Sequence, residues 1–257
     1  MIDPLYALSG LVVGVLIGLT GVGGGSLMTP VLIEVFRMHP VSAVGTDLLY
    51  ATVTKSVGTA VHGLTGNVEW KIVGRLASGS VPATILTMVI LGRFGIHNPG
   101  VAALISMVLA IALLLTAVTL LLKDTILRAA INRTPDFDGS TAVRLTIVVG
   151  FIVGVLVSLS SVGAGALGTT ALMFLYPRLP MPKIVGSDIA HAVPLTLLAG
   201  LGHWWLGAIH LSVLGSLLVG SIPGVVIGSF ASQFVPERAL RSILALVLAV
   251  AGARMLG

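Results

Sequence analysis

Residues 5–36 read LYALSGLVVGVLIGLTGVGGGSLMTPVLIEVF, and this stretch decides the fold of the chain. An apolar run, Leu5–Thr20, meets a glycine-rich run, Gly21–Gly25, and is followed by a shorter apolar run, Leu27–Phe36. A transmembrane helix needs ~20 apolar residues to cross ~30 Å of hydrocarbon. The two apolar runs together are too long for one crossing and short for two, so we expect a helix that breaks within the membrane.

The same pattern returns in residues 145–176, which read LTIVVGFIVGVLVSLSSVGAGALGTTALMFLY. Glycine, valine, leucine and threonine positions of the two stretches match at an offset of 140 residues. Because polar residues rarely fall into one register by chance, the pattern indicates an internal duplication. Further along, positions match at an offset of 141 residues. Among them are Asp47 with Asp188, His62 with His203, and Pro82 with Pro223.

The composition places the chain in a membrane. Of its 257 residues, 56% are hydrophobic and only 9% are charged, against roughly 25% charged residues in soluble domains. The long apolar runs do not alternate with polar residues, which excludes a porin-like barrel. The pI is about 10.1, but the net charge of +5 is spread over short loops, which argues for membrane orientation and against nucleic-acid binding. Since cysteine is absent, disulfides, thiolate metal sites and cysteine nucleophiles are excluded, and we expect no metal site.

These observations predict an all-α polytopic membrane protein built from two homologous repeats. We expect the repeats to be residues 1–122 and 141–257, joined by a polar, cytoplasmic connector, residues 123–140. Each repeat would contain a glycine-broken helix or re-entrant hairpin and three spanning helices. Two-repeat membrane proteins are commonly transporters that hold the substrate where the repeats meet.

Two topologies are open, because each break either kinks one spanning helix or turns the chain back as a hairpin. A kink divides 13 Lys and Arg residues 7 against 6 between the two sides of the membrane, whereas a hairpin divides them 10 against 3. The positive-inside rule favours the hairpin, which makes the repeats inverted and places both termini outside. The ten residues on the inner side would be Lys71, Arg75, Lys123, Arg128, Arg133, Arg144, Arg178, Lys183, Arg238 and Arg241.

The breaks predict an anion site. A helix that begins again after bare glycines presents unpaired backbone amides and the positive end of its dipole. Hydroxyl groups nearby would add hydrogen bonds to a bound oxyanion. The first copy supplies Gly23, Gly24, Gly25, Ser26 and Thr29, and the second copy supplies Gly163, Gly165 and Thr169.

Other glycines have a simpler interpretation. Gly10, Gly14 and Gly18 recur every four residues, as do Gly150 and Gly154. This spacing is typical of helices whose backbones pack closely in a membrane. Close packing is also the alternative for the glycine clusters at the two breaks.

Two aspartates stand at equivalent positions inside apolar segments, where a charge costs about 2.5–3.5 kcal/mol on insertion scales. Asp47 follows Thr46, and Asp188 follows Ser187; we assign both hydroxyl residues to the substrate site. Each aspartate either takes up a proton as the substrate binds or caps the start of its own helix. The two roles are compatible.

A lysine and a histidine accompany the aspartates. Lys55 lies two turns beyond Asp47 and has no counterpart in the second repeat, where Thr196 stands. Its ammonium group either contacts the anion or pairs with Asp47. His191 follows Asp188 by one turn and is a candidate for proton relay.

Four motifs carry a family resemblance: GVGGGSLMTP at 21–30, HPVSAVGT at 39–46, HGLTGNVEW at 62–70 and GSVP at 79–82. They resemble the TauE/SafE sulfite exporter family (toluene-sulfonate uptake permeases), and the resemblance covers essentially the whole chain. It implies a multi-pass permease of the bacterial inner (plasma) membrane for small sulfur-containing anions, with no cofactor and with coupling to protons. Asp47 and Asp188 depart from the family pattern, because many relatives have a small neutral polar residue there.

We therefore expect a secondary transporter that alternates access by rocking one repeat against the other. Its partners would be a sulfur oxyanion such as sulfite, a sulfonate or sulfoacetate, together with protons and the lipid bilayer; a homodimer is left open. An anion channel is the main alternative. A hydrolase that uses Ser26 or Ser80 with a histidine is less favoured, since no nucleophile motif is present, so we do not expect an enzyme.

Overall fold

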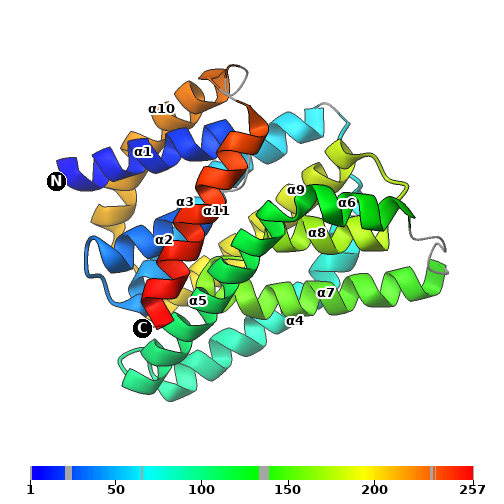
Figure 1. Ribbon diagram of the computed structural model, residues 1–257. Helices are drawn as coiled ribbons and strands as arrows, with labels where there is room; N and C mark the ends of the chain where they lie inside the picture. Colours follow the sequence, from blue (N-terminus) through cyan, green and yellow to red (C-terminus); the bar gives the residue numbers. More distant parts are fainter. Residues whose placement is uncertain are drawn as a thin grey trace.

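The computed structural model (Figure 1) describes residues 2–20, 25–64, 66–132, 139–231, 234 and 236–256. The regular elements in these ranges are α-helices, as the hydropathy pattern predicts. They are α1 (Pro4–Thr20), α2 (Gly25–Glu34), α3 (Pro40–Leu64), α4 (Trp70–Phe94), α5 (Pro99–Leu121), α6 (Lys123–Asn132), α7 (Gly139–Ser160), α8 (Ala166–Leu175), α9 (Met181–Trp205), α10 (Leu211–Ala231) and α11 (Glu237–Leu256).

Several of these helices suit a membrane. Within the described ranges, six are long and apolar enough to cross one: α4, α5, α7, α9, α10 and residues 238–256 of α11. Large apolar side chains also cover outward faces, for example Val226, Ile227 and Phe230 on α10. Hydrocarbon accepts such a surface at no cost, so the chain is a multi-pass membrane protein.

Glycines bring two helix pairs into backbone contact. A Cβ atom on Gly14 of α1 would lie 2.6 Å from the carbonyl oxygen of Ser221 in α10, and one on Gly154 of α7 would lie 2.7 Å from that of Ser80 in α4. The facing helices contribute glycines too, since a Cβ on Gly224 would meet the backbone of α1. The close-packing interpretation of the four-residue spacing is therefore confirmed.

In the main helix pairs, a helix of one half packs against a helix of the other half. Helix α3 and its counterpart α9 pack against each other, as do α5 and its counterpart α11. Helix α1 packs along α10, whereas α7, the counterpart of α1, packs along α4, the counterpart of α10. Two equivalent halves around a pseudo-twofold axis would pack in this way. The boundaries of the repeats and their inverted orientation stay predictions.

The second break is a tight reversal of the chain. Helix α7 ends at Ser160 and α8 begins at Ala166. Between them Ser161, Gly163 and Gly165 have positive φ angles of 60°, 122° and 136°, a region that suits glycine and strains other residues. Figure 1 shows α8 running back alongside α7, which agrees with the hairpin model rather than with a kinked span. The first break, with Gly23 and Gly24, lies outside the described residues.

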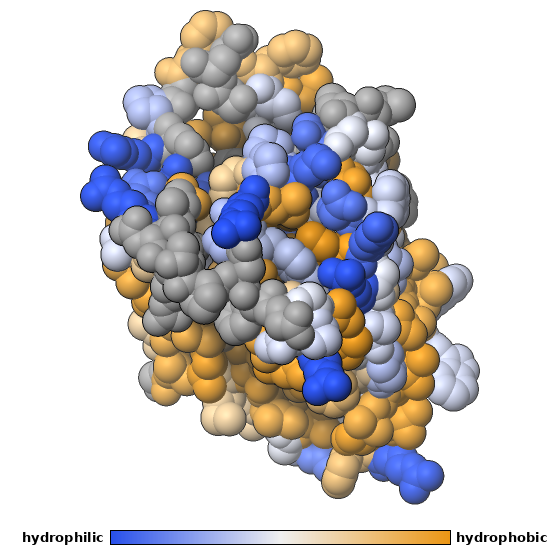
Figure 2. All heavy atoms as spheres, turned by 90° about the vertical axis from the view of Figure 1, so that its right-hand side faces the viewer, coloured by the Kyte–Doolittle hydropathy of each residue, from blue (hydrophilic) through white to orange (hydrophobic). Residues whose placement is uncertain are grey.

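Basic residues gather at one end of the helices. Arg75 donates to Tyr176 at 3.2 Å, and Lys183 lies 3.5 Å from Glu69. Arg241 donates to Asp124 of α6 at 3.1 Å, and this hydrogen bond lowers the pKa of the Asp124 carboxyl. Figure 2 shows hydrophilic side chains gathered on this face beside apolar ones, and Figure 1 places both termini at the opposite end.

The hairpin can be tested by labelling, since the chain has no cysteine of its own. We expect Ser140→Cys and Arg178→Cys to react with a membrane-impermeant maleimide from the same, cytoplasmic side, and His97→Cys to react from the other. The measurement is labelling of intact cells against inside-out vesicles. Kinked spans would instead place Arg178→Cys on the side of His97→Cys.

The close helix contact makes a second prediction. Gly154→Leu would push α7 away from the α4 backbone, and we expect it to cost about 1–3 kcal/mol or more through overpacking. Gly74→Leu on α4 is the matched control, because a side chain there meets open space. Thermal unfolding in detergent, followed by tryptophan fluorescence, should show a lower Tm for Gly154→Leu alone. Equal Tm values would contradict the contact.

Candidate functional site

The two intramembrane aspartates occupy equivalent, buried positions. Thr29 of α2 donates a hydrogen bond to Oδ2 of Asp47, and Thr169 of α8 donates to Oδ2 of Asp188 at 3.0 Å. Neither aspartate is more than 1% exposed. Each short helix that follows a break is thus tied to the long helix after it by a threonine–aspartate hydrogen bond.

The capping interpretation of these aspartates is wrong for their own helices. Asp47 lies seven residues after the first residue of α3, and Asp188 lies seven residues after the first residue of α9. A capping residue stands at the first turn, where the backbone amides are unpaired. Both aspartates instead act on the short helices α2 and α8.

At the second break, a carboxylate of the chain itself lies where an anion was expected. The backbone amides of Gly165 and Thr169, at the start of α8, lie near the Asp188 carboxyl group, whose Oδ1 is buried without a hydrogen-bond partner among the described residues. Gly168 packs directly against this carboxylate, so any side chain at Gly168 would displace it. The positive end of α8 therefore faces Asp188, as the helix dipole favours. An arriving substrate anion has to share this position.

Lys55 joins the first half to the second break. Its ammonium group is buried and donates to the carbonyl oxygen of Ala164 at 3.0 Å. Both Asp188 and Asp47 act electrostatically on it. Lys55 is thus not simply the partner of Asp47. In the second half Thr196 takes the equivalent place and bonds to Thr52 at 3.0 Å.

Asp47 also reaches the second break. The Ser161 hydroxyl, at the first residue of that break, interacts with the Asp47 carboxyl group. Among the described residues, however, neither Oγ of Ser161 nor Oδ1 of Asp47 has a hydrogen-bond partner, and both atoms are buried. Residues 161–169 are therefore the place where both carboxylates and the ammonium group converge.

His191 has one partner and one open nitrogen. Its Nε2 lies 2.8 Å from the Ser80 hydroxyl of α4, while its buried Nδ1 has no partner. Tyr50 and Ser221, which stand at the equivalent positions of the other half, also approach each other. Ser80 is 1% exposed in the middle of α4, and among the residues that the structure describes no third group orients the His191 ring through Nδ1. This geometry is that of a buried structural contact and does not match a nucleophile held by an oriented base.

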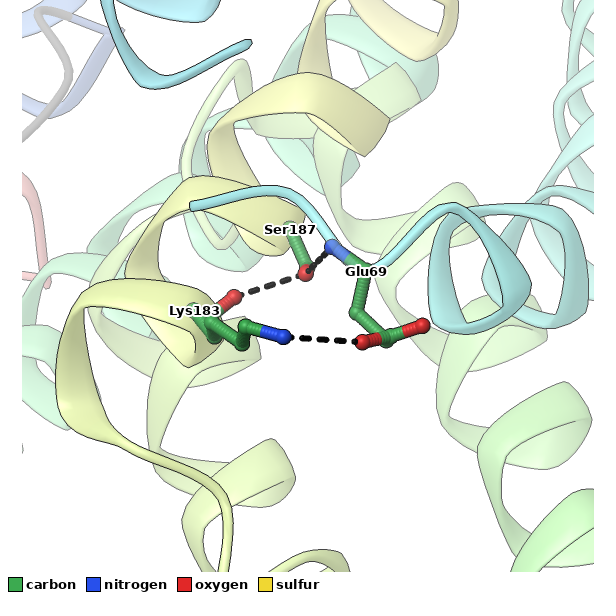
Figure 3. A network of polar contacts seen from close by, with 3 residues as sticks. All are labelled: Glu69, Lys183 and Ser187. Carbon is green, nitrogen blue, oxygen red and sulfur yellow. Dashed lines mark hydrogen bonds and ion pairs between the residues drawn. The ribbon is translucent and has the colours of Figure 1, made fainter. Parts of the chain in front are cut away.

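Two predicted substrate residues have other surroundings. Ser187 accepts a hydrogen bond from the Glu69 amide at 2.8 Å and donates to the Lys183 carbonyl at 2.6 Å, next to the Lys183–Glu69 ion pair (Figure 3). Its hydroxyl therefore fastens the segment before α4 to α9. Thr46 is fully buried with an unpartnered hydroxyl.

The first break is described in part. Gly25 begins α2, and Ser26 is buried at 8% exposure in its first turn. The sequence did not point to Ser161 and Ala164 in the second break, and it suggested Ser80 only as the nucleophile of the less favoured hydrolase. Ser161 lies within the duplicated stretch, where it aligns with Gly21, and nothing in its residue type signals contact with Asp47.

The Lys55 contact predicts a coupling between charges. Lys55→Met leaves the Ala164 carbonyl and the Asp188 carboxylate without their cation, and removing one partner of a buried pair costs roughly 3–5 kcal/mol. We expect Lys55→Met/Asp188→Asn to lose less stability than the sum of the two single variants, because the second substitution removes a carboxylate that Lys55→Met leaves without its cation. Thermal unfolding of the purified variants measures this, and strictly additive losses would argue against the pairing.

Comparison with known proteins agrees with this architecture. The family model of the sulfite exporter TauE/SafE matches residues 6–255. The chain is 38% identical over 252 residues to the probable membrane transporter protein YjnA of Bacillus subtilis (strain 168), covering 97% of this chain and 98% of that protein.

Two further relatives are more distant. The probable membrane transporter protein YdhB of the same organism is 28% identical over 249 residues, covering 95% of this chain and 96% of YdhB. The probable membrane transporter protein MJ0441 of Methanocaldococcus jannaschii is 24% identical over 268 residues, covering 98% and 95%. No solved structure matches the chain. From the family match and the full-length likeness to YjnA, it follows that the chain belongs to the TauE/SafE sulfite exporter family.

Proposed function

We propose that this membrane transporter is a proton-coupled secondary transporter of small sulfur-containing anions such as sulfite, sulfonates or sulfoacetate. The family's name as sulfite exporters and the relatives' names as transporters support the class. The observation that carries the mechanism is the convergence of Lys55, Asp47 and Asp188 on the second break. A buried ammonium group beside a helix start is a site that an anion can use.

The charges at this site supply a reason for proton coupling. An anion that enters beside two ionised carboxylates meets repulsion in a medium that screens charge poorly. Proton uptake by an aspartate removes that repulsion and weakens the hold of the carboxylate on the helix amides. The anion would then take up hydrogen bonds from the helix starts and hydroxyls, with Lys55 as its counter-ion. The residues proposed for this contact are Gly23, Gly24, Gly25, Ser26, Thr29, Thr46, Gly163, Gly165 and Thr169; Ser187 is left out because its hydroxyl already donates to the Lys183 carbonyl.

The close backbone contacts within the α1–α10 and α4–α7 pairs argue against a rocking of one sequence half on the other. Rocking one half against the other would pull α1 from α10 and α4 from α7, which are in backbone contact. We therefore assign alternating access to a movement of the α1–α10 pair against the α4–α7 pair. The α3–α9 interface, which carries Asp47, Lys55 and Asp188, would lie between the moving parts.

Flux through purified protein in proteoliposomes tests the proposal. We expect an imposed pH gradient to drive accumulation of sulfite, thiosulfate, taurine or sulfoacetate, but not of lactate. Asp47→Asn/Asp188→Asn should lose gradient-driven accumulation at least tenfold, because neither carboxyl can then take up a proton. Asp124→Asn, outside the spanning helices, is the matched control and should retain it.

The same assay separates the alternatives. Accumulation above the external concentration excludes a channel, whereas purely downhill flux with a current proportional to voltage would support one. If none of these sulfur anions is transported, with or without the pH gradient, the proposed substrate class is wrong.

A further inference from the structure

A pocket lies at the end of the molecule where basic residues gather. It has a volume of about 420 Å³ and is lined by α4, the first turn of α7, and the end of α8 with the segment that follows it. Two arginines line it, Arg75 from α4 and Arg178 from the segment after α8. No aspartate or glutamate is among the described residues that line it. The described wall of the pocket is therefore basic.

A chain of hydrogen bonds holds Arg75 in this wall. The Thr146 hydroxyl donates to the carbonyl oxygen of Ala142 at 2.6 Å, so it has no proton left for the Tyr176 hydroxyl, which lies 2.7 Å away. Tyr176 therefore donates to Thr146, and its oxygen accepts an N–H of Arg75 at 3.2 Å. Each group in this chain donates away from Arg75, so the chain fixes the guanidinium group and leaves its charge uncompensated.

Other basic residues at this end have carboxylate partners. Lys183, for example, lies 3.5 Å from Glu69. Arg75 is half-buried, and among the described residues it pairs with the Tyr176 hydroxyl and with no carboxylate. Asp136 and Asp138 of the connector lie outside the described residues. A partly buried guanidinium group that neutral hydroxyls hold in place is suited to receive a negative charge from outside the chain.

The chemistry of the wall indicates which anion fits. A guanidinium group has five N–H donors in a planar fork, and it can bind two oxygens of one phosphate or sulfonate group side by side. Leu175 and Leu179 line the same pocket and offer apolar contact to a group attached to that oxyanion. We propose that this pocket binds a phosphate- or sulfonate-type oxyanion that carries an apolar group, with Arg75 as its main contact and Tyr176 as the residue that positions Arg75.

This pocket is separate from the site of the two aspartates. Thr169, which bonds to Asp188, lies in the first turns of α8, whereas Tyr176 follows the last residue of this helix. Helix α8 has 10 residues, so its two ends are ~15 Å apart. The proposal therefore does not rest on the transport function proposed above. Two sources supply an oxyanion of this kind, namely the head group of an anionic membrane lipid and a soluble organic anion.

Protection of a single cysteine measures whether the pocket is occupied. Leu179→Cys places a thiol in the pocket wall, and the chain has no cysteine of its own. The purified full-length protein, in dodecyl maltoside, is titrated with butanesulfonate or inorganic phosphate, and the rate of its reaction with a maleimide is followed. If the oxyanion is soluble, butanesulfonate should slow the reaction in a saturable manner, and chloride at the same ionic strength should not.

A second arm of the experiment identifies a lipid. Phosphatidylglycerol is added to the same micelles, with diacylglycerol as the control, because it has the same apolar part without the phosphate. Protection by phosphatidylglycerol and not by butanesulfonate assigns the pocket to a lipid head group, and the reverse assigns it to a soluble anion; both support the oxyanion site. If no probe protects the cysteine, the proposal is wrong.

Variants of the wall decide whether Arg75 carries the binding. Arg75→Gln should raise the half-protecting concentration about tenfold or more, because hydrogen bonds to a charged group are among the strong ones. Arg144→Gln removes an exposed charge of α7 that does not line the pocket, and as the matched control it should leave this concentration unchanged. Protection that persists in Arg75→Gln, or that falls equally in Arg144→Gln, would overturn the proposal.

Two further variants separate positioning from folding. Tyr176→Phe keeps the guanidinium charge but releases the group, so it should weaken protection less than Arg75→Gln does. Arg75→Lys keeps the charge without the planar fork and should recover part of the lost protection. Gel filtration and thermal unfolding check that each variant is folded. If Arg75→Lys binds no better than Arg75→Gln while both are folded, the charge is not what binds, and the proposal fails.

Discussion

Hydrocarbon offers no hydrogen bonds to the backbone, and this constraint governs the structure. A helix that breaks inside it exposes amides and carbonyls that must find partners within the protein. At the second break, Asp188 lies at the start of α8 and accepts a hydrogen bond from the Thr169 hydroxyl. Lys55 donates a hydrogen bond to the Ala164 carbonyl. The polar residues of the interior therefore stabilise the break. The backbone groups and hydroxyls of the break in turn supply hydrogen-bond partners for these buried residues.

The groups that stabilise the break are also the ionisable groups of the interior. A carboxylate at a helix start can be replaced there by another anion only when its own charge is neutralised or moved. In the proposed mechanism, proton uptake by an aspartate would therefore make a helix start available to the substrate. Lys55 has no charged counterpart in the second half, so one ammonium group serves two carboxylates.

Glycine packing decides which helices are held in backbone contact. Backbone contact between α1 and α10, and between α4 and α7, joins each half to the other and leaves α3 and α9 at the centre. A bundle assembled in this way does not separate into its sequence halves, even though those halves have matching sequences. The charged residues then lie on the two helices that meet across this interface, where a small displacement changes their surroundings most.

The sequence alone determined that this is a helical membrane protein with helices broken at glycine clusters, because hydropathy and backbone freedom are local properties. It also located Asp47, Asp188 and Lys55, because a charge within an apolar run is conspicuous. Only the tertiary structure decided what these groups contact: Lys55 reaches Ala164, 109 residues away, and His191 reaches Ser80, 111 residues away. Such partners are common residue types, and they matter only because packing brings distant helices together, which local pattern does not encode.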